Sequence, residues 1–163
     1  MQIITTRSRL LRTTAIAFGL TALAGCQLFQ NATPSTLASD VSLIAGGLQT
    51  VLATLQANGT IPGLNIQQIT VWVNNIVSAS NQIQTATAGV STSTVSGIAT
   101  TVADIAQYLL PLVPGGSAIV PVIEAAQALV PVILAAAGVA AASAAKPRYT
   151  PKQARALLAA GAA

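Results

Sequence analysis

Few side chains in this sequence are suited to chemistry. It has one cysteine, Cys26, no histidine, and three carboxylates, Asp40, Asp104 and Glu124, that lie far apart among apolar or hydroxyl neighbours. Metal sites need several closely spaced ligands, and acid–base catalysis needs paired titratable groups. We therefore expect no catalytic residue, no metal site and no cofactor, and predict that the chain is not an enzyme. The Cys26 thiol is its one candidate for covalent modification.

The residues before Cys26 have the order of a bacterial export signal. Three arginines within the first twelve residues, without an acidic residue, precede an apolar stretch over 14–23 that is too short to span a bilayer stably. Small residues follow, and Leu23-Ala24-Gly25-Cys26 resembles the lipobox of bacterial lipoproteins. The resemblance covers residues 1–26. It implies signal cleavage between Gly25 and Cys26 and lipidation of the Cys26 thiol with diacylglycerol.

The residue after the cysteine bears on location. In lipoproteins of this kind an aspartate there favours retention in the inner membrane, and this chain has Gln27. The resemblance thus implies a lipid-anchored protein of the bacterial cell envelope, at the outer membrane and facing the periplasm. Two other interpretations stay open: a free or buried thiol at Cys26, and an uncleaved N-terminal membrane helix.

The rest of the chain is poor in charge. Between Gln27 and Ala145 only the three acids are charged, and the remaining basic residues follow in 146–155. With 53% hydrophobic but 3% aromatic residues, the core must consist of Ala, Val, Ile and Leu, and Ser, Thr, Asn and Gln must cover the surface. A single cysteine excludes a disulfide within the chain. Nucleic acid is not an expected partner, because aromatic residues are not interleaved with basic ones.

Aliphatic residues recur at alternating spacings of three and four in three successive segments, which predicts three helices. Short turns separate the segments, so neighbouring helices are expected to be antiparallel. We predict an all-α fold, an antiparallel bundle of about four helices with a short C-terminal helix. The expected parts are a signal peptide (1–25), a lipidated tether (26–33), a bundle domain (34–145) and a basic tail (146–163). The three periodic sets are Leu37, Val41, Ile44, Leu48, Val51 and Leu55; Ile66, Ile69, Val73, Ile76, Ser80 and Ile83; and Val95, Ile98, Val102, Ile105, Leu109 and Leu112.

Capping residues mark several of the expected helix starts. Asn65 with Gln68 three residues later forms a capping pair for the second helix. Thr150, Pro151 and Gln153 give the same signature, with proline at the first helical position, for the C-terminal helix. The same reasoning starts the first helix at Pro34.

The fourth helix, expected over 117–144, is apolar nearly all round. A helix of this kind is either the central helix of a bundle or a membrane span, and the sequence leaves both open. Its alanine content and the prolines within it make membrane insertion marginal. Pro121 is expected in its first turn, and Pro131 is expected to kink it.

The tail carries four cations, Lys146, Arg148, Lys152 and Arg155, with no acid near them in the sequence. Such a cluster could contact an anionic surface, either lipid phosphates or an envelope polymer. A solvated tail that only promotes solubility explains the same residues.

Together these features predict a non-catalytic, lipid-anchored envelope protein with a structural, scaffolding or assembly role. The alternative is a small membrane-permeabilising protein, similar in layout to holins and phage lysis lipoproteins. We also predict homo-oligomers, formed through the small residues of 135–142. Gly46-Gly47 is a second surface without bulky side chains, and its two glycines weaken the first helix unless a neighbouring helix approaches closely there.

Overall fold

Five helices make up the described part of the computed structural model, which comprises residues 34–59, 61, 63–86, 90–115, 117–140 and 147–161. These residues belong to one compact unit, Ala32–Ala163. The predicted all-α class is confirmed. The signal peptide and tether, with Gly25 and Cys26, lie outside the described residues. The helices are α2 (Pro34–Ala57), α3 (Ile66–Thr85), α4 (Thr92–Leu109), α5 (Ile119–Ala136) and α6 (Pro151–Gly161).

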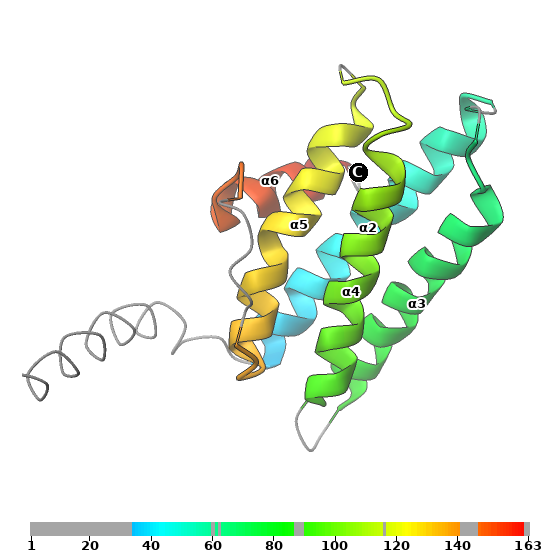
Figure 1. Ribbon diagram of the computed structural model, residues 1–163. Coiled ribbons are helices and arrows are strands. Elements are labelled where there is room, and N and C mark those ends of the chain that lie inside the picture. Colours follow the sequence, from blue (N-terminus) through cyan, green and yellow to red (C-terminus); the bar gives the residue numbers. More distant parts are fainter. Residues whose placement is uncertain are drawn as a thin grey trace, which may run out of the picture. The chain divides into compact units, whose positions relative to one another are not determined.

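The first four helices form a closed ring. Successive helices run in opposite directions, each packs against the next, and α5 returns to pack against α2 (Figure 1). Short connections favour this up-down-up-down arrangement, because each one joins the ends of adjacent antiparallel helices. The fifth helix, α6, packs on α2 and α5.

The core is aliphatic and follows the predicted periodic sets. All six residues of the first set are buried, and in the second and third only Ile66 and Leu112 are not. The polar member, Ser80, is buried next to Ser42, with 3.1 Å between their hydroxyl oxygens. In the described part of the chain, no buried side-chain nitrogen or oxygen lacks a hydrogen bond. The fourth helix adds a further buried set: Ile119, Ile123, Ala125, Ala126, Ala128, Leu129 and Ile133.

The N-terminus of α3 is capped as predicted, with one difference. Asn65 Oδ1 accepts a bond from the Gln68 backbone N–H at 3.1 Å. The Asn65 backbone N–H donates instead to the Tyr108 hydroxyl at 2.8 Å, and that hydroxyl donates to the Gly63 carbonyl at 2.8 Å. Tyr108 also meets Trp72 edge-on, with ring centroids 5.6 Å apart. A side chain of α4 thus fixes the connection between α2 and α3.

The start of α6 has the predicted capping box. The Thr150 backbone N–H donates to Gln153 Oε1 at 3.0 Å, and the Gln153 backbone N–H donates to Thr150 Oγ1 at 3.4 Å. Each residue satisfies an amide of the other, which stabilises the first turn.

The end of α5 differs from the prediction. The helix stops at Ala136 rather than near residue 144, because Gly138 adopts a positive φ of 72°. The Gly138 N–H donates to the Ala135 carbonyl at 3.1 Å and the Val139 N–H to the Leu134 carbonyl at 2.9 Å, which is the pattern of a Schellman motif. The helical face expected over 135–142 is therefore interrupted at Gly138, before the described residues end at 140. The predicted oligomer remains a prediction.

Gly47 lets α6 approach α2 closely. A Cβ atom at this position would lie 2.6 Å from Leu158 Cδ2 and 3.2 Å from Val122 Cγ1. Ala154 and Leu158 of α6 are fully buried. The residues after the expected boundary at residue 146 thus contribute α6 to the same compact unit as the bundle. The close approach also explains how α2 accommodates a buried glycine.

Substitution of glycine tests this contact. Gly97 is an exposed helical glycine of α4 with no atom within 4 Å of an added Cβ. We expect Gly97→Ala to raise the free energy of unfolding by about 1 kcal/mol through helix propensity. Gly47→Ala gains the same propensity but overpacks the α2–α6 contact, so we expect it to lower that free energy by about 1 kcal/mol. Chemical denaturation measures both, and an equal gain at the two positions would contradict the packing.

Candidate functional site

Two neighbouring helices could interact with a membrane. In the described part of the chain, Ser35–Ala57 of α2 and Ile119–Ala136 of α5 are long and apolar enough to cross one, by length and composition alone. In the most apolar 18-residue stretch of each helix, 44% of the residues of α2 and 39% of those of α5 are buried inside the bundle. Core helices of soluble proteins have the same character. Both helices contact α6, so the C-terminal helix lies at the junction between them.

Arg155 of α6 forms a bidentate ion pair with Asp40 of α2. Arg155 Nε lies 2.6 Å from Asp40 Oδ1, and an Nη atom lies 2.7 Å from Oδ2. The Asp40 side chain is 5% exposed, whereas that of Arg155 is 44% exposed. The fork of the guanidinium matches both carboxylate oxygens, which is the strongest geometry for such a pair. The pair therefore neutralises the one charge that α2 places under α6.

Arg148 forms a second, more exposed pair with Glu124 of α5. One Nη atom of Arg148 lies 3.1 Å and 3.2 Å from the two carboxylate oxygens of Glu124. The Arg148 side chain is 70% exposed and that of Glu124 is 21% exposed. Exposed pairs of this kind contribute little to stability and are screened by salt.

Both arginines stay charged over the whole physiological range. The hydrogen bonds to Asp40 raise the pKa of Arg155 above its ordinary value, although burial opposes this. The hydrogen bond from Arg148 to Glu124, together with the charge of Glu124, raises the pKa of Arg148. A raised pKa of a cation gives stability that is present below its ordinary pKa and lost only as the pH rises through the raised value. The guanidinium groups therefore introduce no pH dependence near neutrality.

Two of the four cations in the predicted cluster form ion pairs with acids on the bundle. Arg148 and Arg155 are paired with acids that lie 24 and 115 residues away in the sequence. Lys152 is exposed in the first turn of α6 and forms no ion pair with the described residues. Lys146 lies outside the described residues, as does the predicted lipidation site. A sequence signal for the buried pair existed, because Asp40 lies three residues after Leu37 and directly before Val41, next to the first aliphatic set.

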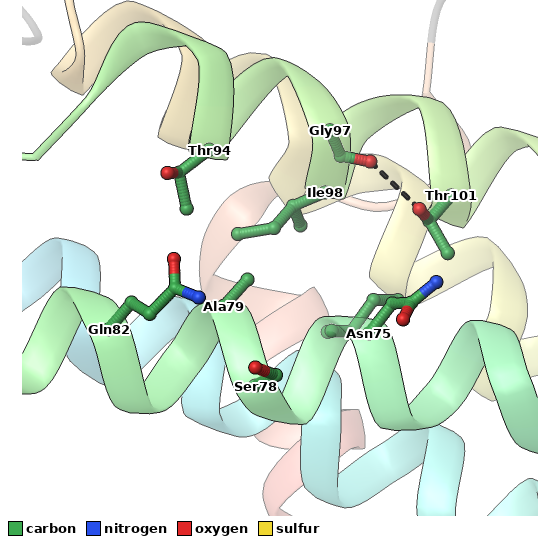
Figure 2. A pocket seen from close by; sticks show the side chains of 9 residues that line it. Asn75, Ser78, Ala79, Gln82, Thr94, Gly97, Ile98 and Thr101 are labelled. Atoms are coloured by element: carbon green, nitrogen blue, oxygen red, sulfur yellow. Dashed lines mark hydrogen bonds between the residues drawn. The ribbon is translucent and has the colours of Figure 1, made fainter.

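A shallow groove between α3 and α4 is the second candidate site, and sequence reasoning missed it. It encloses about 340 Å³, and its lining residues carry hydroxyl, amide or aliphatic side chains and no charge. Figure 2 shows the Gln82 and Asn75 side chains reaching from α3 toward α4, opposite Thr94, Ile98 and Thr101. Thr101 Oγ1 donates to the Gly97 carbonyl at 2.8 Å. The groove offers hydrogen bonds to an uncharged polar group, but its lining holds no general acid or base.

No protein-family model, curated protein or solved structure matches the chain. Among the described residues, no group of three or more His, Cys, Asp or Glu side chains is placed to hold a metal ion.

The ion pair between α2 and α6 is open to a direct test. Arg155→Met keeps most of the aliphatic stem but leaves Asp40 without its partner. Breaking a buried pair from one side is costly, and partial exposure of Arg155 reduces that cost, so we expect a loss of about 2 kcal/mol in the free energy of unfolding.

Lys152→Met is the matched control, because it removes an unpaired cation from the same helix. Denaturant unfolding of the two variants should show a clearly smaller change for Lys152→Met. Equal changes would mean that the pair with Asp40 does not stabilise the fold.

Proposed function

We propose that this chain is a lipid-anchored protein of the bacterial cell envelope, with acyl chains on Cys26 and a helical bundle held beside a membrane. The observation that carries the proposal is the lipobox-like Leu23-Ala24-Gly25-Cys26, placed after a basic and then an apolar stretch. The bundle begins at Pro34, only a few residues after Cys26, so an acylated cysteine would keep it close to the bilayer. Gln27 supports delivery to the outer membrane.

We further propose a structural or assembly role rather than catalysis. The exposed faces of α3 and α4 carry mainly amide and hydroxyl side chains, and Asp104 is the single charged residue of these two helices. Such a surface is suited to many weak hydrogen-bonded contacts and lacks the titratable pairs that acid–base chemistry requires. In this proposal the binding partner of the chain is the membrane itself. Binding to an envelope polymer or to a second copy of the chain remains a separate prediction.

Mass spectrometry of the protein from bacterial membranes tests the anchor. We expect a chain that begins at Cys26 and carries covalently bound acyl groups, because the lipobox signal directs both cleavage and modification. In Cys26→Ser the acyl groups should be absent and the protein should lose its tight membrane association. Ser93→Ala, a substitution at an exposed position of α4, is the control and should leave acylation unchanged. A wild-type chain that retains Met1 or has an unmodified Cys26 would refute the anchor.

One observation favours a second candidate function, that of a membrane-permeabilising protein. α2 and α5 are both apolar enough to span a bilayer, and they are neighbours in the bundle. The two functions differ in a simple assay, the release of a dye trapped in lipid vesicles by the purified Cys26→Ser chain. A scaffold leaves the vesicles intact under conditions where a permeabilising protein empties them. We expect intact vesicles, and complete dye release would favour the second function.

A further inference from the structure

The C-terminal segment 147–161 covers the junction between the two described helices that are apolar enough to cross a membrane. α6 packs on α2 and on α5. Leu158 lies over Gly47 of α2. A Cβ atom added at Gly161 would lie 3.6 Å from Val122 Cγ2 of α5, so the end of α6 reaches the second helix. Ala154 and Leu158 are fully buried in this contact.

Each of the two covered helices forms one ion pair with the segment. Asp40 of α2 binds Arg155, and Glu124 of α5 binds Arg148. These acids are two of the three in the whole sequence. Among the described residues, charge is therefore concentrated at the contact between the segment and the α2–α5 junction.

We propose that the segment 147–161 is a clamp over the α2–α5 junction, and that an anionic lipid membrane is the partner that releases it. Lipid phosphates offer guanidinium groups the same bidentate hydrogen bonding that carboxylates offer. On the bundle, the three cations Arg148, Lys152 and Arg155 meet only two acids. At an anionic surface all three gain partners, so the exchange increases the number of ionic contacts.

The released parts are suited to a membrane surface. α6 has Ala154, Leu157 and Leu158 packed against the core and Lys152 and Arg155 outside it, which is the composition of a basic amphipathic helix. Its departure uncovers apolar side chains of α2 and α5 that a bilayer can bury. In the proposed released state Asp40 is no longer covered by α6 and is open to water at the membrane surface, which limits the cost of breaking its ion pair.

The inference depends on the proposed location at a membrane but not on acylation of Cys26. It is tested on the full chain carrying Cys26→Ser, with spin labels at two exposed positions, Ala53→Cys in α2 and Ala159→Cys in α6. We expect one narrow distance distribution in solution and with phosphatidylcholine vesicles. With vesicles that also contain phosphatidylglycerol, we expect a shift on the order of 10 Å, the diameter of a helix, because α6 leaves its contact.

A second label pair shows whether the bundle stays together. Asn74→Cys in α3 and Gln107→Cys in α4 are at exposed positions, and neither helix contacts α6. The distance between these labels should not change on either kind of vesicle. A shift at this pair equal to that at the α2–α6 pair would mean that the whole bundle unfolds, which overturns the proposal of a clamp.

Variants of the ion pairs test whether lipid phosphates compete with the carboxylates for the cations. Asp40→Asn and Glu124→Gln each remove a carboxylate that competes with lipid phosphates for the cations. In each variant the α2–α6 distance should therefore shift at a lower phosphatidylglycerol content. Glu124→Gln is the milder change and serves if Asp40→Asn impairs folding. Lys152→Gln should require a higher content. An α2–α6 distance that stays unchanged while the chain sediments with anionic vesicles, or a failure to bind them, would overturn the proposal. Absence of acyl groups in cells would instead refute only the anchor.

Discussion

The contact on which the arrangement of the C-terminal segment depends is the bidentate ion pair between Asp40 and Arg155. It joins residues 115 positions apart, and it places a carboxylate that is 5% exposed next to a guanidinium that water still reaches. Without Arg155, the charge of Asp40 would lie uncompensated under α6. The packing of Leu158 over Gly47 supplies the apolar part of the same contact.

The scarcity of charge makes these few ionic contacts more specific than they would be on an ordinary surface. The neutral polar positions on α3 and α4 can exchange one such side chain for another without altering an ion pair. The carboxylates of Asp40 and Glu124, in contrast, attract the C-terminal cations to two defined places on the bundle. The fold thus combines an aliphatic core, which fixes the four-helix ring, with the Asp40–Arg155 pair, which fixes where α6 docks, and a weaker exposed pair before α6.

Much of this fold can be predicted from the sequence, because its signals are local. The spacing of aliphatic residues gave the buried faces of α2, α3 and α4, and the capping pairs gave the starts of α3 and α6. The end of α5 was predicted too late, since an alanine-rich run hides the effect of Gly138, whose positive φ ends the helix.

The candidate site was harder to predict, because its contacts join distant parts of the chain. The cations of the C-terminal segment have no acid near them in the sequence, but folding brings Asp40 to Arg155 and Glu124 to Arg148. The groove between α3 and α4 depends on which faces of two helices meet, and spacing within one helix does not determine that. For Gly47, the sequence indicated only that a neighbouring helix must approach closely. It did not indicate which helix.

Amide hydrogen exchange tests most directly whether α6 is an integral part of the bundle, held by the ion pair. In the full chain without membranes, the amides of Leu157 and Leu158 should exchange far more slowly than in an unfolded peptide, because their helix is docked. In Arg155→Met these two amides should lose protection while those of Ile76 and Val102, in α3 and α4, retain it. Exchange of the Leu157 and Leu158 amides at the unfolded rate in the unsubstituted chain would contradict this account.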